Sequence, residues 1–159
     1  IFIGMYLLCG SGFSQTSIKD LLNKHNDHSV PYIYVDELTK LKTPHFLLDT
    51  REKEEYDISH LEHAIQVGFK GFKVSKIASL PPDKDAMIVV YCSVGIRSEI
   101  IGKKLLAKGY TAVYNLYGGI FEWTNKGGKV YRNQEETPKV HAHSKPWGSY
   151  LLKGTKVYE

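Results

Sequence analysis

The apolar run at residues 86–91 constrains the fold more than any other stretch of this sequence. It consists of Ala, Met, Ile, Val, Val and Tyr, and it follows a Pro-Pro-Asp turn at 81–83. Apolar residues that do not alternate with polar ones are expected in a strand covered on both faces. Strands of that kind occur in parallel sheets with helices packed on either side, so the run predicts an α/β fold.

Short β-prone runs alternate with helical segments along the rest of the chain. We expect strands at 32–35, 46–49, 86–91 and 112–115, and helices at 36–41, 98–108 and 118–123. Asp36 is the expected N-cap of the first helix, and Gly109 is expected to end the second. This alternation predicts a mainly parallel central sheet flanked by helices on both faces, and 159 residues suit a single domain.

Composition separates this chain from disordered and nucleic-acid-binding proteins. Apolar residues make up 42%, which is ordinary for a globular core. The net charge is +4, but the basic residues are scattered and form no dense patch, so no nucleic-acid partner is expected. The mild positive charge favours small anions without identifying one.

Residues 1–14 have the pattern of a secretory signal peptide. Ile1 to Gly10 is almost wholly apolar and uncharged, and a small-x-small triplet at 12–14 precedes a polar stretch. We therefore expect cleavage and an exported protein, periplasmic or otherwise extracytoplasmic, with no transmembrane span in the mature form. The missing basic n-region and initiator Met indicate a truncated sequence.

Two other interpretations of the N-terminus are weaker. The apolar run could instead be a buried strand or helix, but no turn or period connects it to the rest of the chain. Residues 7–10 faintly resemble a lipoprotein acylation site, yet Leu8 is bulky where such sites need a small residue. Cleavage is therefore favoured over lipid anchoring.

Cysteine usage points to one reactive thiol. The chain has two cysteines, Cys9 and Cys92, and cleavage after Ser14 would leave Cys92 alone. A lone cysteine in an exported protein indicates a reactive thiol or intermolecular pairing. No cysteine spacing is typical of zinc, so no metal is expected.

The segment 92–98, Cys-Ser-Val-Gly-Ile-Arg-Ser, carries the chemistry, because it joins the most apolar strand to a helix. A loop curled there would aim backbone N–H groups at one point and stabilise an anion, including a thiolate. Gly95 permits a positive φ, Arg97 adds a fixed charge, and Ser98 either caps the helix or donates to the thiolate. Separately these residues could be an inert cysteine, a turn and a solvated arginine; together they favour a site.

Several motifs in order make the sequence similar to the rhodanese (sulfurtransferase) family. Those motifs are Leu48-Asp49-Thr50-Arg51-Glu52, Glu55-Tyr56 with His60-Leu61 and Ala64-Ile65, Val90 to Ser98, Gly109-Tyr110, Asn115-Leu116, and Gly118 to Trp123. The resemblance covers residues 32–130 and implies a rhodanese-like fold. The family usually has glycines where this chain has Ser59 and His63, so local strain is expected there unless the backbone avoids it. His63 is more simply a surface residue than part of an anion site.

The resemblance implies covalent sulfur transfer with no cofactor. Cys92 would take a sulfane sulfur from a small anionic donor such as thiosulfate, forming a persulfide, and pass it to cyanide or a thiol, including a protein thiol. The N–H groups of Ser93, Val94, Gly95, Ile96 and Arg97 would form the cradle, and Arg97 would orient the donor or brace the loop. Asp49 and Arg51 would pair with each other or support the loop.

Alternatives remain open at this point. A non-enzymatic persulfide carrier or a protein-binding module would share these motifs. A phosphate or arsenate ester enzyme is disfavoured, because only four residues separate Cys92 from Arg97 where cysteine–arginine phosphatases need five. Residues 15–31 are expected to be a linker or short helix, and residues 131–159 a C-terminal extension packed on the domain. In that extension His141 and His143 are weak metal candidates.

Overall fold

The computed structural model describes residues 16–76 and 83–159, so the expected signal peptide at 1–14, with Cys9, and the prolines of the 81–83 turn lie outside the described residues. A parallel sheet of five strands has the order β1–β5–β4–β2–β3. Its strands are β1 (Tyr32–Ile33), β2 (Phe46–Asp49), β3 (Ile65–Gln66), β4 (Ile88–Tyr91) and β5 (Val113–Leu116). The expected α/β fold with a mainly parallel sheet is therefore confirmed.

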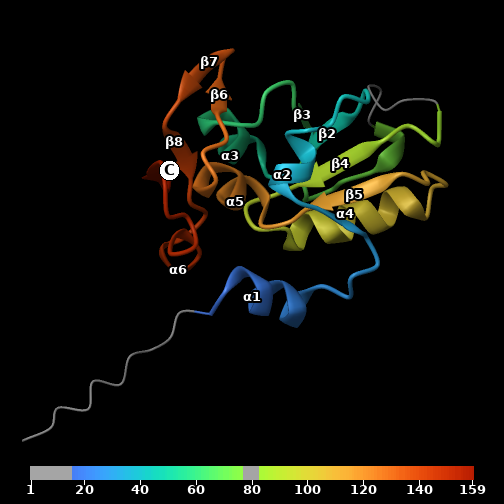
Figure 1. The fold of residues 1–159 in the computed structure, drawn as a ribbon, viewed down its shortest axis with the longest axis horizontal. Helices are drawn as coiled ribbons and strands as arrows, with labels where there is room; N and C mark the ends of the chain where they lie inside the picture. Colours follow the sequence, from blue (N-terminus) through green and yellow to red (C-terminus); the bar gives the residue numbers. More distant parts are fainter. Residues whose placement is uncertain (1–15, 77–82) are drawn as a thin grey trace, which may run out of the picture.

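Helices cover both faces of this sheet, as the apolar run of β4 predicts. The helices are α1 (Ile18–His25), α2 (Val35–Leu38), α3 (Lys53–Ile58), α4 (Ile96–Leu106), α5 (Gly119–Asn125) and α6 (Lys145–Gly148), with a 3-10 turn at Val74–Lys76. Ile88 and Val90 pack with α4 in one buried cluster, while Val89 and Tyr91 pack with α2 and α5 in another. Figure 1 shows α4 running along β4 and β5.

The register of the sheet brings three strand ends to one edge. Asp49 is level with Tyr91, and Val90 is level with Asn115. Thr50 follows β2 and donates from both its N–H and its hydroxyl to the Tyr91 carbonyl, at 2.9 Å in each case. Because the strands are parallel, the loops after β2, β4 and β5 lie at the same edge of the sheet, next to Cys92.

The predicted cap of α2 is wrong, and of the two roles expected for Ser98 the structure shows the contact with Cys92 and not the cap. Asp36 does not cap α2; the helix begins one residue earlier, with Tyr34 as N-cap, and the Tyr34 N–H donates to the Glu37 carboxylate at 2.8 Å. Ser98 does not cap α4, because that helix begins at Ile96 after a left-handed Gly95 with φ 111°. Because Gly95 adopts this left-handed conformation, the helix begins three residues earlier than it would after a cap at Ser98, and its first turn lies next to Cys92.

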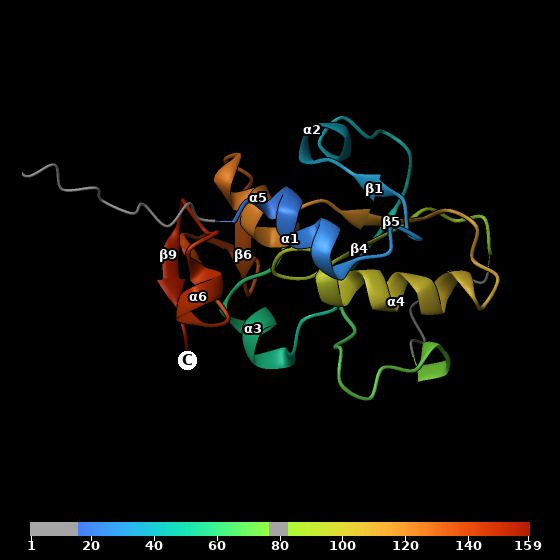
Figure 2. The same cartoon turned by 90° about the horizontal axis from the view of Figure 1, so that it is seen from below.

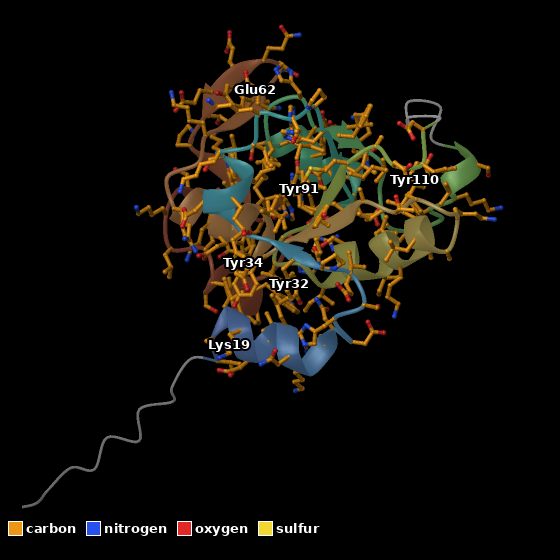
Figure 3. The ribbon with its side chains drawn as sticks, turned by 45° about the vertical axis from the view of Figure 1, so that its right-hand side comes forward. Lys19, Tyr32, Tyr34, Glu62, Tyr91 and Tyr110 are labelled. Atoms are coloured by element: carbon orange, nitrogen blue, oxygen red, sulfur yellow. The ribbon has the colours of Figure 1, made fainter. Side chains whose placement is uncertain are left out.

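The segment expected as a linker contains α1, which packs on the domain. Ser17 caps this helix, and Leu21 and Leu22 are buried. Figure 2 shows α1 beside the first turn of α4. Asn26, which ends α1, donates to the Tyr32 hydroxyl at 2.9 Å, and Figure 3 shows Tyr32 next to α1, whereas Tyr91 lies inside the fold.

Residues 131–159 form a small unit at the end of the sheet where α3 and α5 lie (Figure 1). It contains α6, the strands β7 (Glu135–Thr137), β8 (Lys139–His141) and β9 (Thr155–Val157), and all but the first residue of β6 (Val130–Arg132). Val140, Ala142 and Leu151 are fully buried in the same cluster as Tyr91. Among residues 16–76 and 83–159, no helix has the length and apolarity needed to cross a bilayer.

The start of α5 is docked against the Cys92 loop. The Ile120 N–H donates to the Cys92 carbonyl at 2.9 Å, and the Phe121 N–H donates to the Ser93 carbonyl at 3.1 Å. This approach depends on Gly119, which has φ +55°; a Cβ there would lie 2.3 Å from the Cys92 carbonyl oxygen. The backbone at the start of α5 thus holds the Cys92 loop in place, and position 119 has no room for a side chain.

We expect Gly119→Ala to destabilise the protein by about 3 kcal/mol, because a methyl group there collides with backbone and the residue keeps a positive φ. Gly127→Ala is the matched control: Gly127 has φ +86° but no atom within 4 Å of an added Cβ. It should lose only about 1 kcal/mol from backbone strain. Denaturant unfolding measures both, and equal losses would contradict the close approach.

Candidate active site

Cys92 lies at the N-terminus of α4 with donors directed at its sulfur. The side chain is 1% exposed. The Gly95 N–H lies 3.1 Å from Sγ, and the Ser98 hydroxyl lies 3.6 Å from it. The first N–H groups of a helix have no partner within the helix, so they are available to an anion at this point. The local chain therefore places a nucleophilic atom where negative charge is stabilised.

The surroundings shift the thiol toward its ionised form. Burial raises the pKa of Cys92, because a thiolate loses solvation in the interior. The positive charge of Arg97 and the hydrogen bonds from Ser98 and Gly95 lower it by more, so the pKa of Cys92 lies below its ordinary value. Since the thiolate is the attacking form, the site favours nucleophilic chemistry.

Arg97 is held by Glu55 in a two-pronged ion pair. Its Nη1 and Nη2 donate to Oε2 and Oε1 of Glu55 at 2.6 and 2.7 Å, and Nη2 also lies 3.1 Å from the Ser93 hydroxyl. Of the two roles expected for Arg97, this geometry matches the bracing of the loop. Glu55 lies in α3 and Arg97 in the first turn of α4, so the ion pair connects the helix that follows β2 to the helix that follows β4.

Glu55 remains ionised because its partners outweigh its burial. Burial raises the pKa of Glu55, but hydrogen bonds and charge from Arg97, with smaller contributions from the Glu52 backbone and Arg51, lower it to about 2. His141 from β8 places Nδ1 3.9 Å from Oε1 of Glu55. Burial lowers the pKa of His141, partly offset by the Glu55 charge. The C-terminal extension therefore contacts the ion pair through His141.

The carbonyl of Gly95 is fixed by two asparagine amides. Nδ2 of Asn115, at the end of β5, donates to it at 2.8 Å, and Nδ2 of Asn26 donates to it at 3.0 Å. Asn115 also accepts a hydrogen bond from the Ser98 hydroxyl at 2.8 Å and donates to Glu99 at 3.1 Å. These contacts fix the carbonyl side of Gly95, the residue whose N–H is directed at Sγ.

Asp49 and Arg51 pair with each other and are both fully buried. Nε and Nη2 of Arg51 lie 3.0 and 2.6 Å from the two carboxylate oxygens of Asp49, and Nη2 also donates to the Ser59 carbonyl at 2.6 Å. The guanidinium lies 5.8 Å from the centre of the Tyr91 ring. The pair therefore fixes the chain before α3, and through Tyr91 it supports the strand that ends at Cys92.

The two positions where glycine was expected behave differently. Ser59 has φ −172°, which is extended backbone without strain. His63 has φ 59°, so this residue accepts a left-handed conformation, and its side chain is 89% exposed. The surface interpretation of His63 matches that exposure.

A pocket of about 150 Å³ opens onto Cys92. Its lining consists of Cys92, Ser93, Val94, Ile96 and Arg97 from the loop, His25 from α1, and His143 and Trp147 from the C-terminal extension. A larger hollow of about 750 Å³ lies against β2, Trp123 and Tyr131 and does not include Cys92. The smaller pocket is the one that gives a substrate access to the thiol.

Sequence reasoning missed several residues that the structure brings to the site. Glu55 and Asn115 lie in motifs quoted for the family, so their position there was an available signal. Asn26 and His143 carry no such signal, because only the packing of α1 and the extension brings them close. Within residues 16–76 and 83–159 no group of three metal-binding side chains occurs, so His141 and His143 lack further ligands.

Residues 31–126 match the family described as the rhodanese-like domain, which is more than half of the chain. This protein therefore belongs to the rhodanese-like domain family. The matched range includes Glu55, Cys92, Arg97 and Asn115, and it ends before the C-terminal extension.

Known relatives include sulfurtransferases. The adenylyltransferase and sulfurtransferase UBA4 of Candida albicans is 35% identical over 95 residues, 57% of this chain and 22% of that protein. A tRNA uridine(34) hydroxylase of Yersinia pestis is 37% identical over 82 residues, 50% of this chain and 23% of that protein. The crystal structure of thiosulfate sulfurtransferase from Pseudomonas aeruginosa superposes with a TM-score of 0.60 and 25% identity over 77% of this chain and 23% of that one. The similarity thus spans less than a quarter of each of these proteins.

We expect Arg97→Gln to raise the pKa of Cys92 by about 1 or more, because it removes the positive charge beside the thiolate. The pH dependence of Cys92 alkylation in a Cys9→Ser background measures this value. Arg132→Gln is the control, since it removes the same charge from an exposed position in β6. An unchanged alkylation profile in Arg97→Gln would show that the loop amides and Ser98 alone stabilise the thiolate.

The Glu55–Arg97 ion pair should make the free energy of unfolding depend on pH in the acidic range. The pKa of Glu55 falls from 4.5 to about 2 on folding, so its contribution is complete above pH 4.5 and is lost as the pH falls toward 2. Integrated over that window the contribution is about 3 kcal/mol. Urea unfolding of wild type and Glu55→Gln should show a stability difference that narrows from neutral pH to about pH 3. If the difference in free energy of unfolding between the two proteins stays constant with pH, Glu55 does not titrate with a lowered pKa in the folded protein.

Proposed function

We propose that this protein is a sulfurtransferase in which Cys92 accepts a sulfane sulfur and passes it on as a persulfide. The observation that carries the proposal is the Gly95 N–H directed at Sγ, 3.1 Å away, at the N-terminus of α4. The same donors that favour a thiolate favour the terminal sulfur of a persulfide, which is also an anion. The sulfurtransferases among its relatives support this class of reaction.

The transfer from thiosulfate balances without a cofactor. The Cys92 thiolate attacks the outer sulfur of thiosulfate, the sulfur–sulfur bond breaks, and sulfite leaves with the bonding pair. A thiol or cyanide then attacks the outer sulfur of the persulfide and regenerates the thiolate. The loop supplies the stabilisation of charge in both steps, and Arg97, braced by Glu55, fixes the loop.

Loop geometry favours this reaction over phosphoryl transfer. Four residues separate Cys92 from Arg97, and both Nη atoms of Arg97 are occupied by Glu55 rather than directed at a tetrahedral group over the thiol. An anion above the sulfur is therefore held mainly by backbone N–H groups. That arrangement suits one added sulfur atom better than a phosphate with three peripheral oxygens.

Intact mass after incubation with thiosulfate, polysulfide or mercaptopyruvate tests the proposal. The Cys9→Ser protein should gain one sulfur atom from at least one donor, and cyanide should remove it. The same protein with Cys92→Ser should gain none, because no other cysteine remains in the sequence. A stable load that neither cyanide nor small thiols remove would point instead to a carrier that discharges to a specific partner. No load from any of the three would overturn the proposal.

A further inference from the structure

Two walls of the Cys92 pocket come from outside the matched domain. His25 precedes residue 31, whereas His143 and Trp147 follow residue 126. The rings of His143 and Trp147 lie edge to face with centroids 6.0 Å apart. The loop that performs the chemistry and the walls that a donor meets first are thus separate parts of the chain.

The extension holds this wall in a fixed position. Ala142 and Leu151, on either side of the wall residues, are fully buried. Nδ2 of Asn125 in α5 donates to the Tyr150 carbonyl at 2.9 Å, and its Oδ1 accepts from the Leu152 N–H at 2.7 Å. Because α6 is anchored at both ends, Trp147 is a constant part of the pocket.

The pocket offers little to a dianion. Arg97 is the one Lys or Arg side chain among the described residues that line it, and both of its terminal nitrogens bind Glu55. The carboxylate of Glu55 balances that charge and would repel a second anion placed beside it. A sulfonate group entering here would lose its water without gaining a free cation, which is unfavourable.

The same pocket is well suited to an alkyl–sulfur group. Val94, Ile96 and Trp147 supply apolar surface around the thiol. A cavity of about 150 Å³ with apolar walls has room for a ligand the size of benzene. The end of an alkyl persulfide fills such a volume with carbon and sulfur, while the polar remainder of the molecule stays at the mouth, where the exposed His25 and His143 lie.

We propose that the C-terminal extension makes this site selective for small alkyl persulfides over thiosulfate, with Trp147 as the specificity-determining residue. The proposal rests on the proposed sulfurtransferase function and names the class of donor. Trp147 acts by contacting the alkyl carbons next to the reacting sulfur atoms. The Glu55–Arg97 pair acts in the same direction, because it removes the free cation that a dianion needs.

The corresponding reaction is balanced. The Cys92 thiolate attacks the outer sulfur of the alkyl persulfide, and the bond between its two sulfur atoms breaks. The inner sulfur leaves as an alkyl thiolate with the bonding pair and takes up the persulfide proton. Cys92 retains the transferred sulfur as a persulfide anion, held by the Gly95 N–H.

Single-turnover loading of the Cys9→Ser protein compares cysteine persulfide with thiosulfate, with intact mass as the readout at short times. We expect cysteine persulfide to transfer its sulfur to Cys92 about tenfold faster than thiosulfate does. That factor corresponds to the free energy gained by burying about two methylene-sized groups. Trp147→Ala should reduce the ratio of the two rates by a similar factor, about tenfold, and Trp147→Phe should largely restore it. Leu152→Ala is the control, because this extension residue is 76% exposed and does not line the pocket.

The outcomes separate the two proposals. A wild type that loads from thiosulfate at least as fast as from cysteine persulfide overturns the selectivity but keeps the sulfurtransferase function. A Trp147→Ala protein whose two rates fall equally, with circular dichroism unchanged, overturns the role of Trp147. If neither donor loads the wild type, the sulfurtransferase proposal itself fails, and the selectivity with it.

Discussion

The active-site geometry depends on one residue, Gly95, and on the two peptide units that flank it. Its N–H is directed at Sγ of Cys92, while its carbonyl accepts from Asn115 and Asn26. The left-handed φ of 111° allows both, because it turns the chain sharply from the loop into α4. A Cβ at this position would lie 3.4 Å from the Leu22 side chain and 3.5 Å from the Leu116 carbonyl. The sheet, the N-terminal helix and the loop thus meet at Gly95, and each restrains the residue whose N–H is directed at the sulfur.

Arg97 connects the stability of the protein to its chemistry. Its guanidinium stabilises two anions, the carboxylate of Glu55 and the thiolate of Cys92, and lowers the pKa of both. A buried ion pair gives little net stability compared with apolar packing, but loss of one partner leaves an uncompensated charge. The pair is therefore better explained by what it does at the site than by what it adds to folding. Because Glu55 holds Arg97 in a site only partly open to water, the positive charge of the guanidinium stays fixed beside the sulfur of Cys92.

Local sequence predicted the sheet and the position of Cys92 at its edge, but it did not assign all the residues that surround the thiol. The apolar run of β4 identified a doubly covered strand, and parallel strand ends placed Cys92, Asp49 and Arg51 at one edge. The cap predicted for α2 was wrong, because that helix begins one residue earlier and Glu37 satisfies the Tyr34 N–H locally. α4 begins after the left-handed Gly95, whose carbonyl is held by tertiary contacts from Asn26 and Asn115. The two-residue strand β3 lacks enough length to show a period. Asn26 and His143 reach the site from elements distant in sequence, so no local pattern could assign them.

The division between loop and wall has a physical consequence for how such a site can change. The loop must keep its N–H groups, Arg97 and Glu55 in register, since each acts on the sulfur over a few ångströms and a small displacement weakens all of them. Trp147 and His143 line the pocket from the extension and belong to neither the loop nor its ion pair, so their replacement changes the shape of the pocket and leaves the charges of the loop in place. His141 is the point where the two parts join, because it lies on the extension strand yet faces Glu55. Substrate preference is therefore free to vary at residues 143 and 147, whereas variation at residue 141 also reaches the ion pair that fixes the thiolate.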